Sequence, residues 1–318
     1  MRARFHLPGI SKNFEFNVVF AQMLKNCPDY FREGVEIASF FGTFPPAVWN
    51  GGRSVVGRCD ESFIKQVLRV YNTLGIPVRF TFTNPCITEE LLHDEFCNRI
   101  LELAYNGMNE VIVNSPLLED YIRDKYPNYK LTSSTCKRLD TIDGPINELK
   151  KDYNIVVLDY DLNNKFDLLE QIPAEDRNRV EILCNTLCNP KCKRRKEHYR
   201  LIGEYSIAYN EYVKSGKTTP FNIDEYYEIN EANTIHCECY GRNAFDIRKL
   251  ANHVSPDDIW DKYIPMGFEQ FKIEGRMAGR VFLTENYLYY MVKPECRDEA
   301  RLMLLYNLEK NGIIRIDK

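Results

Sequence analysis

Short runs rich in β-branched and aromatic residues recur along the chain and alternate with longer stretches of helical periodicity. Strict alternation of this kind predicts parallel strands joined by right-handed crossovers. Eight such units are present, and eight parallel strands can close on themselves. We therefore expect an α/β fold, a (β/α)8 TIM-type barrel. The predicted strands are 4–7, 35–41, 78–83, 110–114, 130–134, 155–159, 181–184 and 269–273, with helices at 13–24, 62–74, 89–105, 117–125, 146–151 and 166–172.

The spacing of the predicted strands changes once, between the seventh and the eighth. Residues 185–266 form a connection much longer than the usual loop and helix of such a barrel. They include a cysteine motif at their start and a Tyr-rich helical stretch at 204–213. No repeat or linker divides the chain. The sequence predicts one barrel domain over 1–318 with a metal-binding insertion at 185–266.

The cysteines of this insertion carry the clearest chemical signal. Cys188 and Cys192 flank an Asn-Pro turn, and Cys237 and Cys239 follow as a second pair. Thiolates that converge in this way are the ligands of iron–sulfur clusters and of structural zinc. We expect these four to bind a 4Fe-4S cluster, with zinc as the alternative and Cys184 as a reserve ligand.

The remaining cysteines bear on the cellular compartment. Eleven cysteines are an odd number, and the first residues lack the apolar stretch of a secretory leader. We expect a cytoplasmic protein whose thiols stay reduced. No apolar run reaches the length of a membrane span. The six cysteines without a partner at ligand spacing are predicted to be packed as small hydrophobic residues, namely Cys27, Cys59, Cys86, Cys97, Cys136 and Cys296.

The charge of the chain argues against broad nucleic-acid binding. The formal net charge is -4, and one local basic run lies beside the cysteines. It contains Lys191, Lys193, Arg194, Arg195 and Lys196. The run is either a solvated helix start or a contact for RNA or a phosphate.

One segment resembles a known family. Lys272-Ile273-Glu274-Gly275-Arg276, preceded by Gly267-Phe268, resembles a signature of the peptidase U32 family. Segments 133–135, 156–159 and 180–183 resemble that family's strands, and Cys188 and Cys192 follow the last of them at the matching place. Several relatives are oxygen-independent hydroxylases with a 4Fe-4S cluster. Some of them modify RNA and use prephenate as oxygen source, and others act as a pair in ubiquinone synthesis. The resemblance implies such a cluster, an electron-transfer partner or a related U32 subunit.

Candidate catalytic residues follow from barrel geometry, because active sites lie at the carboxyl ends of the strands. Arg53 follows Gly51 and Gly52, which are expected to let the backbone approach a ligand closely. Arg53 and Arg276 have guanidinium groups suited to a carboxylate or phosphate, and we expect them to face a common anionic ligand across the barrel mouth. Glu274 is expected to accept a proton or to orient Arg276. His198 is expected to hydrogen-bond a cluster sulfur or the substrate. His6, at the end of the first strand, points into the mouth or is a hydrogen-bonded core histidine.

Two classes of function remain. The first is an iron–sulfur enzyme that hydroxylates or otherwise modifies a small anionic molecule or an RNA-borne substrate. The second is a noncatalytic binding protein in which zinc or a cluster holds the insertion together. A U32-type peptidase is a further alternative, although the sequence contains no Gly-x-Ser-x-Gly or His-Glu-x-x-His motif.

Overall fold

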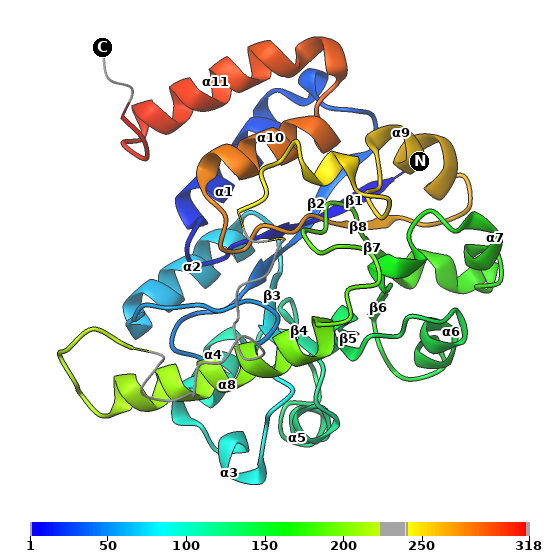
Figure 1. Ribbon diagram of the computed structural model, residues 1–318. Helices are drawn as coiled ribbons and strands as arrows, with labels where there is room; N and C mark the ends of the chain where they lie inside the picture. The colour runs from blue at the N-terminus through cyan, green and yellow to red at the C-terminus, as the bar shows by residue number, and fades with distance from the viewer. Residues whose placement is uncertain (1, 223–238, 240, 316–318) are drawn as a thin grey trace.

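The computed structural model describes residues 2–222, 239 and 241–315. Its sheet is a closed barrel of parallel strands that follow one another from β1 to β8 (Figure 1). The strands are β1 (Ala3–Pro8), β2 (Val35–Gly42), β3 (Val78–Phe82), β4 (Glu110–Val113), β5 (Lys130–Ser133), β6 (Ile155–Val157), β7 (Val180–Leu183) and β8 (Gln270–Lys272). Each predicted strand overlaps one of these, so the expected barrel is confirmed. Pairing of β8 with both β7 and β1 closes it.

Helices surround the barrel, and most of them lie where the periodicity predicts. They are α1 (Phe14–Asn26), α2 (Glu61–Thr73), α3 (Glu89–Leu92), α4 (Glu95–Ala104), α5 (Pro116–Lys125), α6 (Asp143–Leu149), α7 (Phe166–Leu169), α8 (Arg195–Lys214), α9 (Pro256–Asp258), α10 (Arg280–Met291) and α11 (Arg297–Lys310). The single helix predicted over 89–105 is two helices. The Asp94 side chain accepts a hydrogen bond from Cys97 N at 2.8 Å, which caps a new helix start. Helices α10 and α11 lie outside the predicted ones.

The main core lies between the outer face of the strands and the helices. Phe40 of β2 stacks on Tyr71 of α2 with ring centroids 4.4 Å apart, and Phe20 of α1 meets Tyr287 of α10 at 4.8 Å. All four side chains are fully buried. Burial of one such side chain contributes about 1.5–3 kcal/mol, so these contacts are a large part of what fixes the helices to the barrel.

The barrel interior is charged rather than purely apolar. Glu181 of β7 is completely buried, pairs with Arg79 of β3, and lies 2.9 Å from the Lys272 ammonium of β8. Arg79 also donates to Thr132 of β5 at 2.8 Å. These side chains join strands from opposite sides of the barrel, so one carboxylate organises the interior.

His6 belongs to this interior. Its ring nitrogens lie 2.7 Å from Ser39 Oγ and 3.0 Å from Gln270 Oε1, and its side chain is buried. Burial, with Arg79 nearby, lowers the pKa of His6 to about 3. Of the two expectations for His6, the hydrogen-bonded core histidine is therefore correct, and the ring is neutral at pH 7.

Residues 184–269 connect β7 to β8 and include α8, which runs across the barrel near the ends of β3, β4 and β5 (Figure 1). Asn84, just after β3, donates to Gly203 O of α8 at 3.1 Å. A Cβ at Gly203 would lie 2.3 Å from Asn84 Oδ1, so this close approach requires glycine. At the start of α8, Arg195 is buried, and its Nη2 lies 2.5 Å from Asp159 Oδ2. Arg195 is therefore not part of a solvated basic run.

No helix among the described residues is both long and apolar enough to cross a bilayer.

We predict that Glu181→Gln strongly destabilises the protein. The substitution leaves Arg79 and Lys272 buried without their shared anion, and breaking a buried pair in this way costs about 3–5 kcal/mol. The free energy of unfolding in urea measures the effect. The control is Glu36→Gln, which removes an exposed pair with Arg2 and should cost less than about 1 kcal/mol. Equal losses in the two variants would contradict this account of the interior.

Candidate functional site

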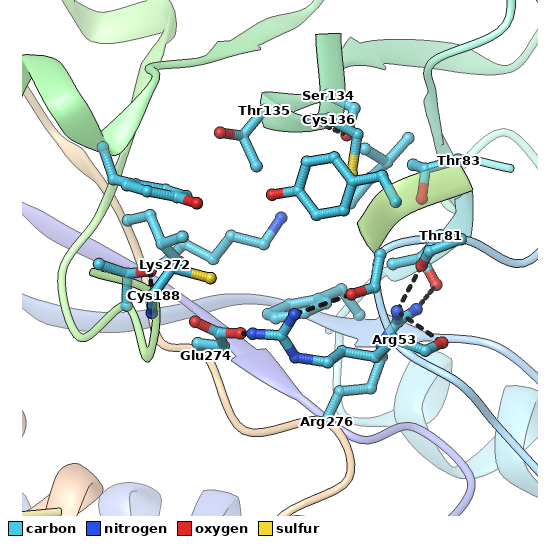
Figure 2. Close-up of a pocket in the computed structure, with 18 residues that line it drawn as sticks. Arg53, Thr81, Thr83, Ser134, Thr135, Cys136, Cys188, Lys272, Glu274 and Arg276 are labelled. Atoms are coloured by element: carbon cyan, nitrogen blue, oxygen red, sulfur yellow. Dashed lines mark hydrogen bonds and ion pairs between the residues drawn. The ribbon is translucent and has the colours of Figure 1, made fainter. Parts of the chain in front are cut away.

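A cavity of about 90 Å³ opens at the carboxyl ends of the strands. We call it the mouth cavity, and Figure 2 shows its walls. The strands contribute its floor, and the loops that follow them contribute the rim. Its lining residues are Phe41, Gly51, Gly52, Arg53, Thr81, Thr83, Ile112, Ser134, Thr135, Cys136, Tyr160, Leu183, Thr186, Cys188, Tyr199, Lys272, Glu274 and Arg276.

Three predicted site residues meet at this cavity. Arg53, Glu274 and Arg276 all line it, so the two arginines share one cavity. Arg53 Nη2 pairs with Glu274 Oε1 (Figure 2). The other Glu274 oxygen accepts a hydrogen bond from Leu187 N at 3.0 Å. The Arg53–Glu274 pair therefore joins the loops after β2, β7 and β8. An anionic ligand must compete with Glu274 for the Arg53 guanidinium group.

Arg276 is held by the protein itself. Its terminal nitrogens donate to Asn50 Oδ1 at 3.0 Å, to Gly51 O at 2.5 Å and to the Thr81 hydroxyl. Burial, and then the charge of Arg53, lower the pKa of Arg276 to about 9. The structure thus gives this guanidinium a role that the sequence analysis does not predict, which is to hold the loop after β2.

The glycines of that loop also differ from expectation. The Gly-Gly pair is expected to let the backbone approach a ligand. A Cβ at Gly51 would instead lie 2.3 Å from Thr83 O, so Gly51 is needed for close packing against the end of β3. Gly52 has a φ of +75°, which favours glycine.

The cysteines are brought together only in part. Cys188 lines the mouth cavity and packs in a small cluster with Tyr160 and Leu183, against which Cys239 also packs. Cys192 is half-buried just before α8, and Cys237 lies outside the described residues. Within the described ranges, no three His, Cys, Asp or Glu side chains gather as a metal site. Cys188 and Cys192 therefore do not complete a four-thiolate site among the described residues. Cys239 is disulfide-bonded here and would need reduction before it could bind a metal or a cluster.

Two other predicted residues lie away from this cavity wall. Cys184, the reserve ligand, is buried in the main core, and its Sγ contacts Ile182 O at 3.4 Å. Burial raises the pKa of the Cys184 thiol well above its usual range, which disfavours the thiolate that a metal needs. His198 lines a neighbouring cavity together with Arg53 and Cys239.

Several lining residues are absent from the sequence-based candidates. Cys136 is predicted to be a packed hydrophobic residue but lies in the cavity wall, where Gly52 approaches its Sγ. Lys272 is noted only as part of the family-like segment. Its signal is the period of two: Gln270, Lys272 and Glu274 alternate with the buried apolar Phe271 and Ile273. Tyr160 and Thr135 each come shortly after a strand end, which is the available signal for them.

The chain is similar to a solved structure of another protein. No protein-family model and no curated protein matches the chain. Among solved structures, the chain is similar to that of the U32 peptidase Mk0906, with a TM-score of 0.47 and 13% identity, over 86% of this chain and 92% of that one. This is the family that the Lys272–Arg276 segment resembles. At this degree of likeness the match indicates no activity for this chain.

We predict that Arg276→Lys loosens the loop after β2. Lysine keeps the charge but cannot reach Asn50, Gly51 and Thr81 at once. The loss of two or three buried hydrogen bonds should lower the free energy of unfolding by about 2–3 kcal/mol. Hydrogen exchange of residues 50–53, followed by mass spectrometry, should become faster. Arg280→Lys, at an exposed arginine of α10, is the control, and exchange rates in the loop that match this control would exclude the role.

Proposed function

We propose that this protein is an oxygen-independent redox enzyme that binds a small anionic substrate, or the anionic part of an RNA-borne one, in the mouth cavity. The proposal further assigns a 4Fe-4S cluster to Cys188, Cys192, Cys237 and Cys239. One observation supports it most: Cys188 lies in the wall of the same cavity as Arg53, Glu274 and Lys272. A noncatalytic metal that only holds the insertion together does not require this proximity.

The cavity walls supply the other elements of such a reaction. Lys272, Arg53 and Arg276 bring positive charge to the mouth cavity, and the Glu274 carboxylate pairs with Arg53 there. Phe41 and Leu183 form an apolar part of the wall, which keeps water away from a bound molecule. Glu274 is placed to accept a proton from a ligand that displaces it from Arg53.

A cluster bound at the cysteines would supply one-electron chemistry beside this cavity. The chain's own residues would orient the substrate and move its protons. The hydroxylation itself, its oxygen donor and an electron-transfer partner or related U32 subunit belong to the proposal. They follow from the resemblance of the Lys272–Arg276 segment.

Anaerobic purification followed by visible absorption, iron and sulfide analysis tests the proposal. We expect a brown protein that contains iron and sulfide and bleaches in air. Stoichiometric zinc without iron would support a zinc-stapled binding protein instead. Protein that binds neither metal after anaerobic reduction and reconstitution would exclude both alternatives.

We predict that Cys188→Ser and Cys192→Ser each lose most of the bound metal, because an open coordination position weakens the whole site. Cys296→Ser, at a half-buried cysteine just before α11, is the matched control and should keep its metal. The barrel should remain folded in all three variants, since neither Cys188 nor Cys192 belongs to the main core. Circular dichroism checks the fold, and an unchanged metal content in both test variants would remove this pair from the ligands.

A further inference from the structure

The mouth cavity contains hydroxyl groups whose protons have no acceptor among the described residues. The Tyr160 side chain is only 1% exposed, and its hydroxyl interacts with the Arg195 guanidinium. Because a guanidinium can only donate, the Tyr160 hydroxyl proton has no acceptor in the described part of the chain. The Thr135 hydroxyl, in the same wall, lacks a partner there. A buried hydroxyl whose proton has no acceptor costs free energy, which a bound acceptor would recover.

Lys272 adds further donors at the cavity floor. Its side chain is directed toward the centre of the cavity (Figure 2), and its ammonium lies 2.9 Å from Glu181 Oε1. Within the described ranges, Glu181 is its ion-pair partner. An ammonium has three donors, so this single carboxylate oxygen leaves at least one of them available to a ligand.

The charges around Lys272 favour an anion. Arg79 faces two carboxylates, Glu181 and Glu110, and the Glu110 carboxylate lies 3.5 Å from Arg79 Nε; Lys272 also faces Glu181. Arg53 is balanced by Glu274, whereas Arg276 bonds neutral acceptors among the described residues. The interior and the floor thus hold more positive than negative charge. Burial, together with Arg79 and Arg276, lowers the pKa of Lys272, and a bound carboxylate would act in the opposite direction.

The walls restrict the size and the shape of the ligand. A volume of about 90 Å³ holds several water-sized groups, which suits a short ligand. Phe41, Ile112 and Leu183 line it beside the donors, and the Lys272 ammonium lies 4.3 Å from the Phe41 ring centroid. An inorganic anion would leave this apolar surface without a contact.

We propose that Lys272, Tyr160 and Thr135 bind the carboxylate of a short-chain acid, with its carbon chain against Phe41, Ile112 and Leu183. The assignment rests on the part of the proposed function that places an anionic substrate in the mouth cavity, but it does not depend on the cluster. In this assignment the ligand is bound by Lys272, Tyr160 and Thr135, which have available donors. The guanidinium groups of Arg53 and Arg276 are already bonded to other groups of the protein. Arg53 and Arg276 then shape the cavity around the bound acid.

Calorimetric titration of the full chain with pyruvate, propionate and inorganic phosphate tests the assignment. We expect the two carboxylates to bind at millimolar concentrations or tighter, and phosphate to bind more weakly. Lys272→Met should weaken carboxylate binding by about tenfold or more, because it removes a charged donor. Tyr160→Phe should weaken it by about two- to tenfold, because it removes one neutral donor.

Matched controls separate binding from folding. Lys65→Met and Tyr306→Phe change exposed residues of α2 and α11 and should bind as the unaltered protein does. Circular dichroism and the thermal midpoint of each variant check the fold. Because Tyr160→Phe removes a hydroxyl that donates to no described residue and keeps the ring beside Arg195, it should fold normally even if Lys272→Met does not.

The outcomes also distinguish this inference from the proposed function. Carboxylate binding that is unchanged in Tyr160→Phe and in folded Lys272→Met would overturn the assignment, and so would the absence of binding by either acid. Such results leave the metal analysis unaffected. Binding that depends on Lys272 and Tyr160, in a protein that takes up no iron, would support the assignment and refute the redox proposal.

Discussion

The ion pairs of the buried Glu181 carboxylate are the interactions on which the rest of the structure depends. This carboxylate lies inside the barrel, fully buried, and attracts Arg79 from β3 and Lys272 from β8. His6 remains neutral beside it, so the ring adds hydrogen bonds without adding charge. A buried carboxylate with such partners keeps its charge, and the pKa of Glu181 is held far below its usual range by Arg79 and Lys272 despite burial. Because Lys272 is tied to Glu181, the floor of the mouth cavity is set by the same contact that organises the barrel.

Above this floor, the protein divides its polar groups between structure and ligand. Arg276 bonds the loop after β2, and Arg53 and Glu274 join three loops across the rim. Arg195 pairs with Asp159, and its Cζ lies 4.4 Å from the centroid of the Tyr160 ring, over which it stacks. This contact holds the tyrosine in place. The groups that look most like ligand-binding residues are therefore used to build the cavity. The groups left with available donors are a lysine, a tyrosine and a threonine that the surrounding contacts hold in place.

Much of the fold could be predicted from the sequence, because strands buried on both faces give short apolar runs whose alternation with helices is visible along the chain. Helix boundaries differ from the prediction where a capping side chain sets them. Asp94 caps the start of α4 and so separates it from α3. The interior charges could not be predicted in the same way. Arg79 and Glu181 are far apart in sequence, and each is a single charge within an apolar run, so nothing local shows that they pair. For the candidate site, barrel geometry placed Arg53, Glu274 and Arg276 at the carboxyl ends of the strands, and all three line one cavity. It could not show that Arg276 is already bonded to the protein, or that the Tyr160 and Thr135 hydroxyls donate to no acceptor among the described residues.

The position of Cys188 connects the two parts of the molecule that the sequence analysis treats separately. Its thiol belongs to the cysteine motif at the start of the long connection, yet it packs on Leu183 at the end of β7 and on Tyr160. Leu183 is paired in register with Lys272 in the neighbouring strand. A change at the cysteines therefore reaches the cavity floor through directly packed residues rather than through a flexible loop. Tyr160 also contacts Arg195 at the start of α8, so a metal at the cysteines and an acid in the cavity would both act on the same tyrosine. This shared contact is the physical route by which a bound metal and a bound acid would influence each other's affinity.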